Sequence, residues 1–307
     1  MIFPRHKYKK RRIDRQMTSK DRVLTALKGQ EPDRIPTFEW DIDHHVIHAL
    51  CPECEYFDFI DRMNLDAVVV SPNYESEIIE EDILRDEWGV IRKKGLEAYP
   101  IPLEEFAPLK DLSALNSYEF PKPITEKRFV TLKKAVDRFA NEKAIIMRIR
   151  DVFSTPRDLR GYSRILMDTI QNPSFVSTIV KQIIKHNIEI AKEAVRIDAD
   201  IIASGDDYAD NSGLIMSPQT FRELLLPSFR ELVAKVKEDG SFFIKHTDGN
   251  IMAIIEDLID SGIDCIDPID PLAGMNIEEI KKKYGRKVTI NGNIDCVNTL
   301  CRHPIKC

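Results

Sequence analysis

The sequence lacks any apolar run long enough to cross a bilayer, and no signal-type apolar stretch opens it. It also lacks an excess of positive charge, because 45 Lys and Arg residues stand against 51 Asp and Glu, a formal net charge of -6. Binding a phosphate backbone needs a basic face. We therefore expect no nucleic-acid partner and no membrane partner, and a small substrate or a protein as the partner instead.

Cysteine is sparse, with six residues scattered along the chain. One Cys-x-x-Cys pair is present, "CPEC" from Cys51 to Cys54, and no second pair accompanies it. A lone pair of this kind is a weak indication of a zinc or redox site. Without a secretory segment, the sequence predicts free thiols and a cytoplasmic location.

Long linkers and internal repeats are missing as well, so 307 residues with 43% hydrophobic content predict one barrel-sized domain. Only the start differs, because residues 1–16 are strongly basic and lack helical periodicity. We expect them to be a disordered leader or an upstream translation extension without function. The predicted domain, residues 17–307, begins with a helix that Thr18 caps and Gly29 ends.

What is present is a series of short apolar or β-branched runs, each followed by a helical pattern. Near-continuous apolar strands that alternate with helices are typical of a parallel sheet covered on both faces. Capping residues predict helices that begin after Asn172, Ser217 and Asn276. Within residues 73–143 the pattern loosens, and "DEWGVIRKKG" suggests a small hairpin. The seven predicted strands are residues 34–40, 66–72, 144–150, 200–207, 242–250, 264–270 and 288–295.

Polar residues gather at the carboxyl ends of the predicted strands. In parallel α/β folds, and above all in the (β/α)8 barrel, that end of the sheet carries the active site. A closed barrel has eight strands, so the sequence predicts an α/β barrel of this type with its last βα unit missing. The candidate site residues are Asp206, Asp207, His246, Asp248, Asp267, Asp270 and Asn293.

The segment "HTDGNIMAIIEDLIDSGIDCIDPIDPLAGMNIEEIKKKYGRKVTINGNID" resembles the C-terminal half of the uroporphyrinogen decarboxylase superfamily. The resemblance extends upstream through "SGDDYADNSGLIMSPQTFRELLLPSFREL" and "LRGYSRILMDTIQNPSFV", and it covers about residues 17–301. It implies a TIM-type barrel and one of two chemistries, which are decarboxylation without metal or cofactor and zinc-dependent methyl transfer to corrinoid proteins or pterins.

The decarboxylases resemble one another in an arginine-rich segment just after the first strand. The corresponding stretch here is "PTFEWDIDHHVIHAL", with Glu39, Asp41 and Asp43 and no arginine. Acidic residues there would repel the carboxylates of a tetrapyrrole. This departure argues against porphyrin decarboxylation.

The methyltransferases of the superfamily bind zinc through a His-x-Cys strand end and a further Cys near the last strand. In this chain His246 occupies the His position and Asp248 stands where the Cys would be. Aspartate also binds zinc, and a harder oxygen ligand leaves the zinc more electrophilic than a thiolate does. The resemblance therefore implies a zinc site of His246 and Asp248, with a third ligand expected beyond residue 307.

The resulting hypothesis is a zinc-assisted methyltransferase that moves a methyl group from a methoxylated or methylamine-like small molecule to a corrinoid protein. Asp206 or Asp207 would position the substrate or accept a proton. The predicted substrate-binding residues are Arg150, Asp267, Asp270 and Asn293.

Three other interpretations stay open. The first is decarboxylation of an acidic substrate held by Arg148 or Arg150, since a guanidinium binds carboxylates through two parallel hydrogen bonds. The second is an inactive remnant whose missing last unit exposes a strand edge. The third is structural, with His246 and Asp248 as a hydrogen-bonded pair at a strand end. His44, His45 and His48 lie on a predicted helix and are expected to be exposed.

Overall fold

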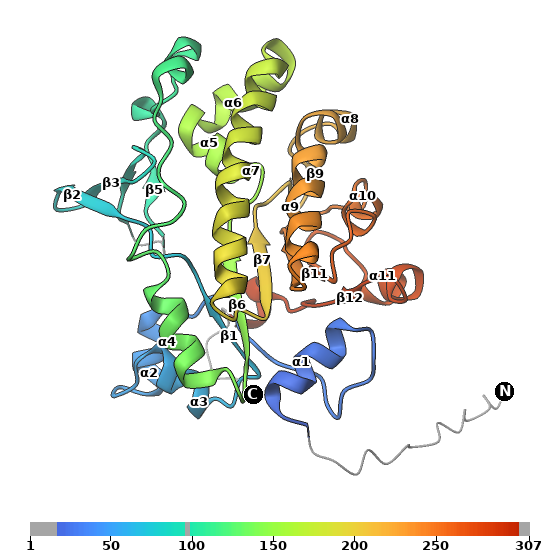
Figure 1. The fold of residues 1–307 in the computed structure, drawn as a ribbon. Helices are drawn as coiled ribbons and strands as arrows, with labels where there is room; N and C mark the ends of the chain where they lie inside the picture. Colours follow the sequence, from blue (N-terminus) through green and yellow to red (C-terminus); the bar gives the residue numbers. More distant parts are fainter. Residues whose placement is uncertain (1–16, 96–98, 301–307) are drawn as a thin grey trace.

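The computed structural model describes residues 17–95 and 99–300 (Figure 1). The predicted leader, residues 1–16, lies outside the described residues, as do residues 301–307 of the predicted domain. In the described part of the chain, no helix is both long and apolar enough to span a membrane.

A six-stranded parallel sheet forms the centre of the molecule, and this confirms the predicted fold class. Neighbouring strands pair in parallel along its whole width. In the described part of the chain, the two edge strands of this sheet are its first and its last strand in sequence. In spatial order the strands are β1 (Ala67–Val70), β6 (Ala144–Ile149), β7 (Ile201–Gly205), β10 (Phe242–His246), β11 (Cys265–Asp267) and β12 (Thr289–Ile290).

Alternate side chains of the sheet point to two sides. On the inner side, small and branched residues such as Ala67 and Ala203 pack together with Leu27 of α1 (Ser19–Leu27). The carbonyl of Ala26 in α1 accepts a hydrogen bond from the hydroxyl of Thr289 in β12. Helix α1 therefore closes the inner side at the amino-terminal ends of the strands.

The outer side of the sheet packs against helices, which lie in front of the strands in Figure 1. Three long helices cover it, namely α4 (Val130–Phe139), α7 (Pro173–Arg196) and α9 (Leu226–Glu238). Their apolar residues form one core with Val68 and Met147 of the strands. This arrangement buries the strands on both sides, as their nearly unbroken apolar sequences predict.

The prediction of a strand at residues 34–40 is wrong. The structure has no regular strand there, and the backbone N–H of Asp66 donates to the carbonyl of Thr37. Pro36 lies in the middle of the run and has no N–H to donate to a sheet. Phe38 and Trp40 nevertheless pack against the inner core, so the segment still covers that side of the sheet.

The helix boundaries follow the predicted caps. Thr18 accepts a hydrogen bond from the N–H of Asp21 at the start of α1, and Asn276 accepts from the N–H groups of Glu278 and Glu279. The other elements are α2 (His44–Leu50), α3 (Tyr56–Arg62), η1 (Glu104–Phe106), η2 (Leu112–Ser117), α5 (Ser154–Arg160), α6 (Tyr162–Gln171), β8 (Ala209–Asp210), β9 (Gly213–Leu214), α8 (Pro218–Thr220), the π-helical η3 (Phe221–Leu225), α10 (Ile255–Ile259), α11 (Ile277–Tyr284) and the π-helical η4 (Cys296–Leu300).

The loosely patterned region contains the predicted hairpin. It pairs β3 (Ile83–Asp86) with β4 (Ile91–Lys93) in antiparallel fashion. Strands β2 (Ser76–Glu80) and β5 (Ile101–Pro102) extend the hairpin to four strands. Asp86 accepts hydrogen bonds from the N–H groups of the turn that follows it.

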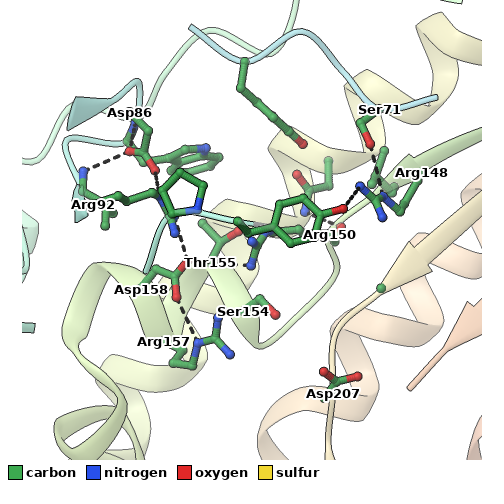
Figure 2. Close-up of a pocket in the computed structure, with 18 of the residues that line it drawn as sticks. Ser71, Asp86, Arg92, Arg148, Arg150, Ser154, Thr155, Arg157, Asp158 and Asp207 are labelled. Atoms are coloured by element: carbon green, nitrogen blue, oxygen red, sulfur yellow. Dashed lines mark hydrogen bonds and ion pairs between the residues drawn. The ribbon is translucent and has the colours of Figure 1, made fainter. Parts of the chain in front are cut away.

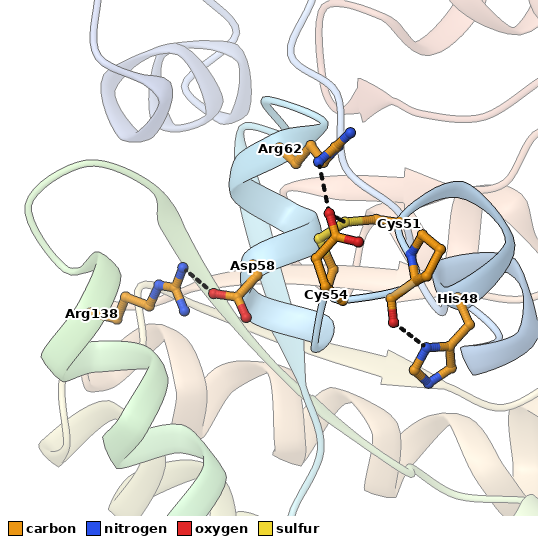
Figure 3. The surroundings of a disulfide bond; sticks show 8 residues. His48, Cys51, Cys54, Asp58, Arg62 and Arg138 are labelled. Atoms are coloured by element: carbon orange, nitrogen blue, oxygen red, sulfur yellow. Dashed lines mark hydrogen bonds and ion pairs between the residues drawn. A yellow bond between two sulfur atoms is a disulfide. The ribbon is translucent and has the colours of Figure 1, made fainter.

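The prediction of free thiols is wrong for Cys51 and Cys54, which form a disulfide (Figure 3). Cys51 caps the carboxyl end of α2, and the N–H of Cys54 donates to the carbonyl of Cys51 at 3.0 Å. This turn brings the two Cα atoms to 5.3 Å, a separation that a disulfide can bridge. Cys265, by contrast, is a buried free cysteine.

Candidate active site

A cavity of about 550 Å³ lies at the carboxyl ends of the parallel strands. Residues directly after β1 and β6 line it, together with the last residues of β7 and β10 and Asp207. The antiparallel sheet, α5, Trp40 and Asp41 before α2, and Asn187 of α7 also contribute to its wall. Of the predicted site residues, Arg150, Asp207 and His246 line this cavity.

His246 ends β10 between two carboxylates. Its Nδ1 lies 2.5 Å from Oδ2 of Asp267, and its Nε2 lies 3.5 Å from Oδ2 of Asp248. The indole of Trp40 stacks on the imidazole with ring centroids 4.6 Å apart. Burial lowers the pKa of His246, but the hydrogen bonds and charges of Asp248 and Asp267 outweigh burial and raise the pKa to about 9.

Asp207 completes a cluster with His246 and Asp248. One ligand atom from each residue lies within 4.8 Å of the other two. The backbone N–H of Asp248 donates to Oδ1 of Asp207 at 3.0 Å, which joins the loop after β10 to the loop after β7. Both aspartates are exposed, so the cluster is open to the cavity and to solvent.

The donor set of this cluster fits a divalent zinc ion. It offers one imidazole nitrogen and two carboxylate oxygens, which are all common zinc ligands. A zinc-binding histidine usually donates its other ring N–H to a carboxylate, and Asp267 occupies that position for His246. Asp207 would be a third ligand within the described residues, and the ligand expected beyond residue 307 stays a prediction.

Asp206 lies behind the wall of the cavity and is 1% exposed. Its Oδ2 accepts the N–H groups of Phe153 and Ser154, at the start of α5. Its Oδ1 has no hydrogen-bond partner among the described residues. Burial and the charge of Asp151 raise the pKa of Asp206 to about 7. Of the two predicted catalytic aspartates, therefore, only Asp207 faces the cavity.

A buried charge network beneath the cavity was missed by the sequence analysis. Lys245 donates through Nζ to Oδ2 of Asp151 at 2.6 Å and to the carbonyl of Asp206 at 2.8 Å. The hydroxyl groups of Ser204 and Tyr208 also donate to Asp151. A lysine inside the apolar run "FFIKH" is a signal for such a network, because a buried charge requires a partner.

Four arginines line the cavity, and two of them are already balanced by carboxylates. Arg148 pairs with Asp41 of the acidic segment. The negative charge of Asp41 is therefore balanced within the protein and repels a substrate carboxylate less. Arg92 donates to Asp86 at 2.7 Å and to Asp158 at 2.8 Å (Figure 2). Sequence reasoning missed Arg92, because its strand belongs to the loosely patterned region.

Arg157 and Arg150 share Asp158 with Arg92. Arg157 donates through Nε to Oδ1 of Asp158 at 2.9 Å, and NH1 of Arg150 lies 3.7 Å from Oδ2. Sequence reasoning missed Arg157, which lies in α5 two residues before the quoted "LRGYSRILMDTIQNPSFV" begins.

The remaining predicted residues have other surroundings. Asp267 holds His246 and accepts a hydrogen bond from Asn291, so it positions the imidazole. Asp270 accepts the N–H of Leu272 two residues later, and neither Asp270 nor Asn293 lines the cavity. The three histidines of α2 are exposed as expected, namely His44, His45 and His48.

Comparison with known proteins gives a family and a fold. The family model described as uroporphyrinogen decarboxylase (URO-D) matches residues 102–305. The structure is similar to that of a methyltransferase from Methanosarcina mazei, with a TM-score of 0.71 and 18% sequence identity over 92% of this chain and 85% of that chain. The carboxyl transferase domain of Rhizobium etli pyruvate carboxylase gives a TM-score of 0.33 and 16% identity, covering 54% of this chain and 24% of that chain. No curated protein sequence matches this chain.

Proposed function

Since the chain belongs to the uroporphyrinogen decarboxylase family, we propose that it is a zinc-assisted methyltransferase whose ion is bound by Asp207, His246 and Asp248. The methyl group comes from a small methoxylated or methylamine-like molecule, and a corrinoid protein accepts it. The similarity in fold to a methyltransferase is in keeping with this proposal.

The observation that carries the proposal is the position of the imidazole of His246. It lies in the cavity wall, its Nδ1 is held by Asp267, and its Nε2 is directed toward Asp248. A hydrogen-bonded strand end alone would not require Asp207 as a further carboxylate within 4.8 Å of a ring nitrogen of His246. Three ligands and an open side are the usual arrangement of a catalytic zinc site.

Bound zinc would act as a Lewis acid that polarises the methyl-bearing oxygen or nitrogen of the substrate. The residues of the chain prepare that site. Asp267 fixes the orientation of the imidazole, and Trp40 covers one face of the ring and keeps water from it. Lys245, next to His246 in β10, anchors the strand to the buried Asp151. A site held by rigid strand ends loses little energy to reorganisation when substrate binds.

The proposal is tested by elemental analysis of zinc in the purified protein. We expect about one zinc per chain in the wild type, and loss of that zinc in His246→Ala and Asp207→Asn. The matched control is His48→Ala, because His48 is an exposed histidine of α2 that should not affect zinc content. A compact wild type without zinc, or zinc retained by His246→Ala, would contradict the proposal.

A second candidate is metal-free decarboxylation of an acidic substrate, because Arg150 and Arg157 line the same cavity. The two candidates differ in their dependence on metal. If protein treated with a chelator releases carbon dioxide from a carboxylic acid substrate as fast as untreated protein does, the second candidate replaces the first.

A further inference from the structure

One end of the cavity carries an excess of positive charge. Arg92, Arg150 and Arg157 surround the carboxylate of Asp158, which is 2% exposed. Asp86 also pairs with Arg92 and is the second carboxylate of this group. Three guanidinium groups thus face two carboxylates, and one positive charge remains unbalanced. We call this group the arginine cluster.

The unbalanced charge lies on the exposed members of the arginine cluster. The side chain of Arg150 is 40% exposed and that of Arg157 is 30% exposed, whereas that of Arg92 is 16% exposed. Among the described residues the side chain of Arg150 has no partner closer than its 3.7 Å contact with Asp158. Arg157 uses only its Nε for Asp158, so its terminal nitrogens are available.

Arg148 differs from this cluster, although it lines the same cavity. It pairs with Asp41, donates to the hydroxyl of Ser71 at 3.1 Å and contacts the hydroxyl of Tyr99. Its hydrogen-bonding capacity is therefore occupied within the protein. An incoming anion finds its free donors on Arg150 and Arg157.

The other end of the cavity has the opposite charge. Asp207 lies apart from Asp158, Arg92 and Arg157 in Figure 2. Asp207 and Asp248 together place two carboxylates beside His246. Without metal these carboxylates repel an anion, and a bound zinc ion would balance their two charges, so in both states the unbalanced positive charge of the protein lies at the arginine cluster and orients an anionic substrate.

The wall of the cavity is aromatic in part. Tyr74, Trp88 and Tyr99 line the cavity, and Trp40 covers the imidazole of His246. Aromatic side chains offer flat apolar surfaces to a planar ligand. A cavity of about 550 Å³ is of the size that holds a small organic acid.

We propose that Arg150 and Arg157 bind the carboxylate of a methylated monocarboxylic acid and direct its methyl-bearing end toward His246. This inference rests on the proposed function for the direction of the methyl group. A single unbalanced positive charge matches a monoanion rather than a phosphate, which carries up to two charges at neutral pH. The planar guanidinium also matches the two oxygens of a carboxylate.

The test is isothermal titration of the full chain with 4-methoxybenzoate, with its neutral analogue 4-methoxybenzamide and with inorganic phosphate. Losing a charge-assisted hydrogen bond weakens binding by about tenfold or more. We expect that loss for 4-methoxybenzoate in Arg150→Gln and in Arg157→Gln. The amide should bind the wild type about tenfold more weakly than the acid does, and it should not respond to these substitutions.

The matched control is Arg85→Gln, because Arg85 is an exposed arginine of β3 that pairs with Glu77 outside the cavity. Thermal melting of each variant separates lost binding from lost folding, and Arg150→Lys retains the charge if Arg150→Gln is unstable. The proposal is overturned if the amide binds as tightly as the acid, if phosphate binds more tightly, or if Arg150→Gln and Arg157→Gln bind the acid like the wild type.

The titration is repeated on protein treated with a chelator. Because Arg150 and Arg157 are separate from the zinc ligands, arginine-dependent binding of the acid is expected to persist without metal. A protein that binds the acid in this way and yet never retains zinc would refute the methyltransferase proposal and leave the carboxylate site in place. A protein that retains zinc but binds the acid and the amide equally well would refute the carboxylate site and leave the methyltransferase proposal in place.

Discussion

Lys245 and Asp151 form an ion pair of 2.6 Å in which both side chains are completely buried. Removing one member of a buried pair leaves an uncompensated charge, which costs about 3–5 kcal/mol. We therefore predict that Lys245→Met lowers the free energy of unfolding by that amount in urea titrations. Lys283→Met is the control, since Lys283 is an exposed lysine with a side chain that is 60% accessible. Equal stabilities for both variants would show that the buried pair contributes nothing.

His186 makes the stability depend on pH. Burial lowers the pKa of His186 to about 4, while an unfolded chain has a histidine pKa near the ordinary value. As pH falls below about 6.5, the unfolded state takes up the proton first, so the free energy of unfolding falls, by up to about 3 kcal/mol at pH 4. Urea titrations between these pH values measure the slope. His186→Phe removes the titrating group, and the slope should flatten relative to the wild type; an unchanged slope would contradict the assignment.

Gly249 allows Asp248 to reach the cluster. Its φ is 84°, and a Cβ on it would lie 2.6 Å from the carbonyl oxygen of Asp210. Gly240 is a matched control with a φ of 82° and no atom within 4 Å of its Cβ position. We predict that Gly240→Ala costs about 1–2 kcal/mol from backbone strain alone. Gly249→Ala should cost about 1–3 kcal/mol more because of the clash, and it should also weaken zinc binding. Equal costs and equal zinc contents would contradict this prediction.

Asp267 should affect zinc affinity without touching the ion. Its carboxylate accepts the Nδ1 hydrogen bond of His246, and loss of such a partner typically weakens zinc binding by about 10-fold to 100-fold. Competition titrations with a zinc-binding dye measure this change in Asp267→Asn. Asp270→Asn is the control, since the carboxylate of Asp270 accepts the N–H of Leu272 in the same loop and does not contact His246. Zinc affinity that is unchanged in Asp267→Asn would mean that the imidazole needs no carboxylate support.

The sequence predicted the parallel sheet and the helix caps because these depend on local patterns. Thr18 and Asn276 cap their helices through contacts only two or three residues away. The predicted strand at residues 34–40 failed for a local reason too, because Pro36 interrupts the pattern of donors.

The proposed third zinc ligand, Asp207, could not be predicted from a local pattern, because its position depends on how two strands pair. His246 pairs with Gly205 in the register of β10 and β7, and this register brings Asp207 to the same site. Asp206 and Asp207 point to opposite sides of the chain, because successive side chains of an extended segment alternate. The sequence alone does not say which of the two faces the cavity.

The arginine cluster depended on tertiary structure alone. Arg92 comes from a hairpin and Arg157 from a helix, 65 positions apart in the sequence (157 − 92 = 65). They meet through Asp158, which no local pattern distinguishes from a surface aspartate on a helix.

The hydrogen bond between Asp207 and the backbone of Asp248 joins two loops that follow neighbouring strands. An ion held by Asp207 and His246 would bind only the folded chain, because unfolding separates residues 39 positions apart in sequence (246 − 207 = 39). Mass action then couples metal concentration to stability, by about 2.7 kcal/mol when free zinc is about 100 times its dissociation constant. The melting temperature therefore becomes a thermodynamic measure of site occupancy that requires neither a substrate nor an acceptor protein.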